Sequence, residues 1–114
     1  MEKIFEQAML YDFYGELLKD NQKEVFENYV LDNLSLSEIA EERNISRQAV
    51  YDMIKRADRA LNEYEDKLHL LEKFLTLKEV VNSIHIISKQ LTDSRDRELA
   101  TQIVSITDKI LDEL

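Results

Sequence analysis

The stretch LSLSEIAEERNISRQAVYDMIKRADRAL, residues 34–61, decides the fold. Ser35, followed three residues later by Glu38, forms a capping-box pattern that predicts the start of a short helix. Asn44 follows that helix, and asparagine tolerates the left-handed conformation that a sharp turn requires. Ser46 can then cap a second helix through its side-chain oxygen. This order of residues predicts two helices that cross through a tight turn, a helix-turn-helix.

Apolar residues in this stretch have the spacing that such a motif needs. Ile39 and the small Ala40 are expected to point inward on the first helix, so that a second helix can pass close by. Ile45 is expected to fill the corner between the helices. The second helix has a buried face at helical spacing, formed by Val50, Met53, Ile54, Ala57 and Leu61. We interpret the second helix as the one that faces nucleic acid.

Composition favours an all-α protein. The chain has 114 residues, of which 44% are hydrophobic, enough for one domain or a small module with a tail. It contains no Pro and one Gly, so residues typical of β-turns are nearly missing. We expect an N-terminal tri-helical helix-turn-helix, a long connecting helix and a C-terminal helical hairpin. The absence of Cys excludes a disulfide scaffold and a thiolate metal site.

Charge is distributed unevenly. The net charge of −9 argues against a general nucleic-acid coat. Residues 46–60 hold 4 basic and 2 acidic side chains, whereas residues 1–33, for example, hold 3 basic and 8 acidic ones. Residues 34–45 and 61–114 are net negative as well, so the segment that contains the second helix of the motif is the only net-positive one. Such a protein should depend on specific contacts, on the avidity of a dimer or on a partner.

Two helices are expected before the motif. Residues 1–18 have an apolar face, and Gly15 within them is either tolerated, at about 1 kcal/mol relative to Ala, or marks the close approach of a neighbouring helix. Asp20 or Asn21 is expected to cap a second helix that ends near Leu31. This second helix would support the helix-turn-helix, as in tri-helical DNA-binding domains.

A heptad pattern continues beyond the motif to Leu75. If the helix from Ser46 is unbroken, it is about 45 Å long; a bend near Asn62 is the alternative. We expect a module at residues 1–61 and a tail for packing or dimerisation at residues 62–114. The expected oligomer seam of a homodimer is Leu61, Tyr64, Leu68, Leu71 and Leu75.

The tail is expected to form a helical hairpin. Thr76 and Glu79 form a second capping box, which predicts a helix from Thr76 to about Leu91. The polar residues 92–97 (TDSRDR) predict a break. A last helix would bury the stripe Leu99, Ile103, Ile106, Ile110 and Leu114. We expect the hairpin to pack on the long helix and across a dimer.

Two resemblances support these interpretations. Residues 35–57 (SLSEIAEERNISRQAVYDMIKRA) resemble the fourth region of bacterial sigma factors, the helix-turn-helix that reads the promoter −35 element. The whole chain is similar to the small YlxM family of Gram-positive bacteria, through residues 20–29 (DNQKEVFENY), 46–54 (SRQAVYDMI) and 61–68 (LNEYEDKL). The family resemblance implies a DNA-binding or regulatory protein. Its genes usually lie beside signal recognition particle genes, which implies a role in that pathway.

The first turn of the second helix holds the candidate base-reading residues. Arg47 can bond guanine in bidentate fashion, and Gln48 can bond adenine. Tyr51 can touch a thymine methyl or a phosphate. The sigma-like pattern implies the same base-reading role for these three residues. The expected phosphate contacts are Ser46, Lys55, Arg56 and Arg59.

Other interpretations remain open. The same face can be an ordinary solvated or protein-binding surface, with Asp52 paired to Lys55 or Arg56 within the helix. The acids of the first helix would repel phosphates or recruit a basic partner: Glu38, Glu41 and Glu42. The chain would then be a protein- or RNA-binding adaptor of the signal recognition particle or RNA polymerase, without sequence-specific DNA binding. A third interpretation is a purely structural helical dimer.

No enzyme is expected. His69 and His85 are far apart and lack a second ligand at helical spacing, so each is expected to be an ordinary helix residue. The carboxylates are not paired in an apolar setting, and a single Gly provides no phosphate-binding loop. No cofactor or metal is therefore expected. The most apolar run, Val80–Ile87, is too short to span a bilayer and no signal peptide opens the chain, so we expect a cytoplasmic protein.

Overall fold

The computed structural model describes residues 3–91 and 94–113 of the chain. Over these residues the regular secondary structure is entirely helical, which confirms the all-α class predicted from the sequence. The elements in chain order are α1 (Lys3–Tyr14), the 3₁₀ turn η1 (Gly15–Leu17), α2 (Asp20–Val30), α3 (Leu36–Arg43), α4 (Arg47–Leu68), α5 (Leu70–Lys89) and α6 (Ser94–Glu113).

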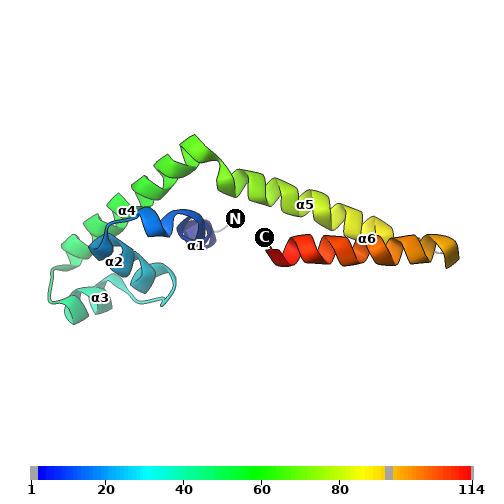
Figure 1. The fold of residues 1–114 in the computed structure, drawn as a ribbon. Coiled ribbons are helices and arrows are strands. Elements are labelled where there is room, and N and C mark those ends of the chain that lie inside the picture. Colours follow the sequence, from blue (N-terminus) through cyan, green and yellow to red (C-terminus); the bar gives the residue numbers. More distant parts are fainter. Residues whose placement is uncertain (1–2, 92–93, 114) are drawn as a thin grey trace. The chain divides into compact units, whose positions relative to one another are not determined.

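The chain forms two compact units, Met1–Leu71 and Glu72–Leu114. The division falls after Leu71, whereas the sequence predicted a module that ends at residue 61. In the first unit, α1, α2 and α3 lie along α4 (Figure 1). Its core is made of side chains that are at most 1% exposed: Leu10, Tyr14, Val25, Phe26, Ile39, Val50, Ala57 and Leu61.

Helix α1 ends earlier than the predicted helix over residues 1–18. It stops at Tyr14, and the 3₁₀ turn η1 begins at the buried Gly15. A Cβ atom on Gly15 would lie 2.6 Å from Cε2 of Tyr11, which is shorter than real contacts allow. The close approach at Gly15 therefore comes from a ring of the preceding turn and not from a neighbouring helix.

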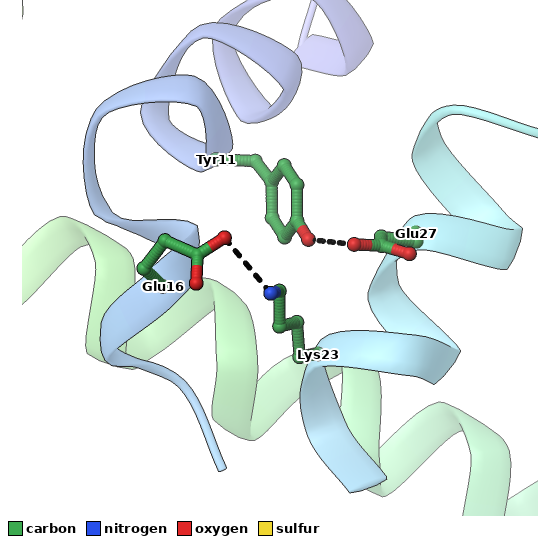
Figure 2. A network of polar contacts seen from close by, with 4 residues as sticks. All are labelled: Tyr11, Glu16, Lys23 and Glu27. Atoms are coloured by element: carbon green, nitrogen blue, oxygen red, sulfur yellow. Dashed lines mark hydrogen bonds and ion pairs between the residues drawn. The ribbon is translucent and has the colours of Figure 1, made fainter. Parts of the chain in front are cut away.

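The Tyr11 ring is held in this position by α2. It stacks on Phe26, with ring centroids 5.8 Å apart, and its hydroxyl donates a hydrogen bond to Glu27 (Figure 2). Burial raises the pKa of Tyr11 above its ordinary value, and the bond to Glu27 adds to the shift. Nearby, Lys23 Nζ lies 2.9 Å from Glu16 Oε1. These contacts fix α1 and η1 against α2.

The predicted caps of α2 are wrong. The N-cap is Lys19, whose side chain makes no capping bond, and α2 starts at Asp20. Asp20 thus lies in the first turn, where a negative charge is favourable beside the positive end of the helix dipole. After the helix, Asn33 takes a left-handed conformation with φ 57°, and the backbone N of Leu34 donates to the Asn28 carbonyl.

Helix α4 continues past Asn62, where the sequence left a bend open, but it does not reach Leu75. It ends at Leu68, because His69 takes the left-handed conformation with φ 55° and ψ 29°. Helix α5 begins immediately afterwards. Of the two alternatives that the sequence left open, the helix that runs unbroken to Leu75 is therefore excluded, and the predicted helical position of His69 is wrong.

Helix α5 also begins earlier than its predicted capping box. Thr76 lies inside α5, so the predicted helix start at that residue is wrong. Other groups of the first unit bind the true start: Glu65 accepts a hydrogen bond from the backbone N of Leu71 at 3.0 Å, and the Tyr14 hydroxyl accepts one from the backbone N of Leu70 at 3.2 Å. These bonds satisfy N–H groups that lack partners inside the helix.

Tyr14 connects the end of α1 to this junction. Its side chain is 1% exposed, and its hydroxyl donates to Glu65 Oε1 at 2.6 Å. Burial and the bond to Glu65 raise the pKa of Tyr14 above its ordinary value. Its ring lies 5.9 Å from the ring of Tyr64 on α4. One buried hydroxyl therefore links α1, the last turns of α4 and the first turn of α5.

Replacement of Tyr14 by Phe is expected to lower the free energy of unfolding by about 1–3 kcal/mol, because it removes the donor to the Glu65 carboxylate and an acceptor for the start of α5. Urea denaturation followed by circular dichroism would measure the loss. Tyr64→Phe is the matched control, since no hydrogen bond of its hydroxyl occurs among the described residues. An equal loss in both variants would contradict the role of the Tyr14 hydroxyl.

The five residues expected to form an oligomer seam do not make one continuous stripe. Leu61 is 0% and Leu71 is 6% exposed, and both are buried in the first unit. Leu68 is 47% exposed, whereas Tyr64 and Leu75 are half-buried. The break between α4 and α5 separates the last two of the five from the others. Their role in an oligomer stays a prediction.

The second unit is the predicted helical hairpin, with α5 and α6 running in opposite directions (Figure 1). His85 Nε2 lies 3.1 Å from Asp108 Oδ1 and joins the two helices. Residues 92–93 and Leu114, which the sequence assigned to the break and to the last stripe, lie outside the described residues. Residues 94–97 were expected in the break but belong to α6. Among the described residues, no helix has the length and apolar character needed to cross a membrane.

Candidate nucleic-acid interface

The turn between α3 and α4 is built by local hydrogen bonds. Ser35 Oγ accepts a bond from the backbone N of Glu38, and the Glu38 carboxylate accepts one from the backbone N of Ser35, which confirms the capping box. Asn44 has φ 56° and ψ 45°, the predicted left-handed conformation. Ser46 Oγ accepts a bond from the backbone N of Ala49 at 3.0 Å, so the predicted cap of α4 is confirmed as well.

Ile45 does not fill the corner as predicted. Its side chain is 39% exposed, whereas its backbone N donates to the Ala40 carbonyl at 3.0 Å. The turn is therefore closed by a backbone bond across the left-handed Asn44, the usual way in which a helix C-terminus satisfies its last carbonyls.

Apolar packing fixes how α4 is rotated about its axis. Val50, Ala57 and Leu61 are 0% exposed and Ile54 is 7% exposed, which confirms most of the predicted buried face. Met53, also predicted there, is half-buried. Because this side of α4 lies against the core, the opposite side must face solvent.

Arg43, at the end of α3, holds the motif onto α2. Its Nη1 lies 3.2 Å from Glu24 Oε2, and its Nη2 donates to Asn28 Oδ1 at 3.1 Å. The role of Arg43 could not be predicted from the sequence, because its partners lie on another helix at no regular spacing from it. Its function here is positioning, since two planar donors fix the angle at which α3 meets α2.

The solvent-facing side of α4 carries the residues predicted to contact nucleic acid. Lys55 Nζ lies 5.5 Å from the centre of the Tyr51 ring, a cation–π contact that places both side chains together. All the predicted base and phosphate contacts are exposed: Ser46, Arg47, Gln48, Tyr51, Lys55, Arg56 and Arg59. All seven side chains are therefore accessible to a ligand.

The two acids of this helical segment are engaged in hydrogen bonds. Asp52 accepts a hydrogen bond from Gln48 Nε2 at 3.0 Å. This partner differs from Lys55 and Arg56, the two partners considered from the sequence. Asp58 is half-buried and accepts a bond from the buried Gln7 Nε2 at 3.1 Å. Four basic side chains therefore stand against these two acids in residues 46–60, whereas the rest of α4 carries Lys67 and three more acids.

A cleft of about 310 Å³ adjoins Tyr51 and Lys55. Lys3 of α1 and Tyr29 of α2 also line the cleft. Neither residue was predicted from the sequence to belong to the site. No spacing relates these residues to α4, because three different helices bring them together. Lys3 adds a cation to the rim of the basic surface.

The first helix of the motif, α3, carries exposed acidic side chains. Glu41 and Glu42 are exposed, and Glu38, also exposed, uses its carboxylate in the capping box. The basic face of α4 is thus a narrow strip beside an acidic helix. A ligand that follows this strip must be anionic and must approach mainly along α4.

Comparison with known proteins agrees with this geometry. The model of the family described as "Putative helix-turn-helix protein, YlxM / p13 like" matches residues 1–103. The chain belongs to this family. The UPF0122 protein YlxM of Bacillus subtilis (strain 168) is 42% identical over 110 residues, which cover 96% of this chain and 97% of that protein.

Other members of the YlxM-like family are equally similar. A UPF0122 protein of Bacillus thuringiensis (strain Al Hakam) is 44% identical over 112 residues, which cover 96% of this chain and 98% of the relative. A UPF0122 protein of Thermoanaerobacter sp. (strain X514) is 43% identical over 107 residues, or 94% of this chain and 89% of the relative. The YlxM-like family therefore accounts for both units of the chain.

Proposed function

We propose that the first unit binds duplex DNA through the exposed side of α4 and acts as a DNA-binding regulatory protein. The observation that supports this most is the exposed basic strip at residues 46–60, where four basic side chains stand against two acids, Asp52 and Asp58, that accept hydrogen bonds from Gln48 and Gln7. A rigid turn, capped at both ends, presents the first turn of α4 in the way that major-groove docking needs.

In this proposal, Arg47, Gln48 and Tyr51 contact bases, because they lie at or near the exposed first turn of α4. The phosphate contacts are assigned to Ser46, Lys55, Arg56 and Arg59. Phosphate contacts position the helix without reading sequence, and they make binding depend on salt. The acidic α3 limits how many phosphates the unit can neutralise, so affinity has to come largely from base contacts.

The test is a selection from random duplex DNA at about 100 mM salt, where non-specific phosphate binding is already weakened. Wild type is expected to enrich a motif. The double variant Arg47→Ala, Gln48→Ala is expected to lose about 1–3 kcal/mol for each base contact, thus about 2–6 kcal/mol together, or roughly 30-fold or more in affinity for that motif. Lys67→Ala is the matched control, because it removes one positive charge from an exposed position elsewhere on α4.

Equal affinity of wild type and the double variant would overturn the base-reading roles. A comparable loss in Lys67→Ala would show that only overall charge matters. The helical circular dichroism of all variants should match, since none of these side chains is buried.

A second candidate function is favoured by the exposed acids of α3 and by the net charge of −9. In this proposal the helix-turn-helix serves as an adaptor for a protein or RNA of the signal recognition particle, or for RNA polymerase. It requires that no DNA motif is enriched, and that the purified chain binds one of these components. Charge reversal at Glu41 and Glu42 should then weaken the binding of a basic protein partner, whereas it should strengthen DNA binding in the first proposal.

A further inference from the structure

Small and polar side chains make the contact between α5 and α6. Val81 and Ser88 on α5 are each 4% exposed, and Ala100 and Thr107 on α6 are 5% and 4% exposed. Ser88 and Ala100 also line one common cavity. Only two of these four buried residues, Val81 and Ala100, are apolar, so the four provide little of the apolar burial that holds two helices together.

The large apolar residues of the same helices lie outside this contact. On α5 the exposed residues Leu77, Val80, Ile84 and Ile87 follow a 3-4-3 spacing, and Leu91, which lies two residues past the end of α5, continues it. On α6 the exposed residues are Leu99, Ile103, Ile106 and Ile110, with a 4-3-4 spacing. Their exposed fractions range from 36% to 61%. Each helix therefore has one continuous apolar stripe that its partner in the hairpin does not cover.

Helix geometry places both stripes on the same face of the hairpin. On each helix the apolar stripe precedes the contact stripe by one residue, as Ile84 precedes His85 and Ile106 precedes Thr107. One residue corresponds to a rotation of about 100° around the helix axis. Because α5 and α6 run in opposite directions, this same offset turns both stripes toward one side. We call these nine residues the hairpin apolar face.

The size of the hairpin apolar face matches a protein interface. Each helix has 20 residues and is thus about 30 Å long and about 10 Å wide, so the two together present roughly 600 Å². Exposed apolar patches of monomers rarely exceed a few hundred Å², and a stable interface buries about 800 Å² per partner. The area of the face is therefore at the upper end of the exposed apolar patches found on monomers and approaches the area that one partner buries in a dimer.

The pattern of the face is suited to a second copy of itself. Apolar residues at alternating spacings of three and four form the seam by which helices pack side by side, and a two-fold contact uses the same patch on both chains. The residues that border the stripes are Thr76, Ser83, Gln90, Gln102 and Lys109. None is acidic, although the chain carries a net charge of −9. Two copies therefore meet without carboxylate repulsion, and the border offers no negative charge to attract a basic partner.

We propose that the hairpin apolar face binds the same face of a second chain, so that two hairpins form a four-helix bundle. In such bundles, apolar stripes at heptad spacing pack inside and polar faces remain in water. The proposal moves the dimer contact from the predicted seam, of which Leu61 and Leu71 are buried in the first unit, to the hairpin apolar face. It does not depend on what α4 binds.

The test is the molar mass of the full chain in solution, by light scattering and sedimentation at micromolar concentration. Wild type is expected at twice the 13.5 kDa of one chain. Ile84→Glu and Ile103→Glu are each expected to raise the dissociation constant at least about 100-fold, because each would bury a carboxylate without a partner. Ile86→Glu is the matched control: Ile86 is 51% exposed, but it lies on the opposite side of α5.

A monomeric wild type at micromolar concentration would overturn the proposal. So would a loss of dimer in Ile86→Glu as large as in Ile84→Glu. If either glutamate variant loses helical circular dichroism, Ile84→Ala takes its place, with an expected rise in the dissociation constant of about tenfold or more. An unchanged dissociation constant in that folded variant would also contradict the proposal.

Discussion

Replacement of Phe26 by alanine is expected to lower the free energy of unfolding by about 3–5 kcal/mol. Phe26 is 0% exposed, and its ring stacks on Tyr11 between α1 and α2. The substitution removes the transfer free energy of a large side chain and leaves a cavity that the surrounding helices only partly close. Small domains have total stabilities of about 5–15 kcal/mol, so a change of this size brings the first unit close to unfolding.

Urea denaturation followed by circular dichroism would measure this loss. Phe5→Ala is the matched control, since Phe5 lies on α1 but is 61% exposed. The control is expected to change the free energy of unfolding by less than about 1 kcal/mol. If both substitutions cost the same, Phe26 would not be the centre of the core that the structure places there.

Leu61→Ala is expected to cost about 2–5 kcal/mol, whereas Leu68→Ala should cost less than about 1 kcal/mol. The two leucines lie on the same helix and in the same predicted seam. Leu61 is 0% exposed and Leu68 is 47% exposed, because only the first contributes to the core of the first unit. The comparison therefore separates a core role from a role in an oligomer.

Thermal denaturation at several protein concentrations would complete this experiment. A core residue changes stability by the same amount at every concentration, whereas a residue at an oligomer contact has an effect that depends on concentration. If the loss in Leu61→Ala disappeared in dilute solution, the predicted seam would be supported and the core assignment contradicted. If the loss stays constant, the core assignment stands.

The parts of the fold that the sequence predicted well are those formed by residues a few positions apart. The cap at Ser35, the left-handed Asn44 and the cap at Ser46 each depend on neighbours within one helical turn. Their hydrogen bonds need no other part of the chain. The buried side of α4 was predicted for the same reason, because a spacing of three and four residues is repeated along one helix.

The errors occur where distant residues decide the outcome. The heptad pattern runs through His69 without interruption, yet α4 ends there, and Tyr14 and Glu65 bind the first backbone N–H groups of α5. Tyr14 and Leu70 are 56 positions apart in sequence. The capping box at Thr76 was locally sound but had no effect, since α5 had already begun. The close approach at Gly15 comes from the Tyr11 ring, which neither alternative for Gly15 included, because contacts to α2 fix that ring.

The candidate site was predicted in part. The exposed side of α4 follows directly from its buried side, so the positions of Arg47, Gln48 and Tyr51 on the surface could be derived from spacing. The partners of these residues could not. Lys3 and Tyr29, from two other helices, line the cleft that Tyr51 borders, and only the packed structure brings them there. The roles of these residues in binding stay predictions.

The bond between Gln48 and Asp52 has a consequence for selectivity. Only one of the two amide hydrogens of Gln48 is used in this bond, so the second hydrogen and the carbonyl oxygen remain for a base. The bond holds the Gln48 side chain in one orientation in the free protein. If α4 binds DNA as proposed, less side-chain freedom is lost on binding. A side chain held in one orientation also fits fewer bases, so this position would favour a base whose donor and acceptor match that orientation.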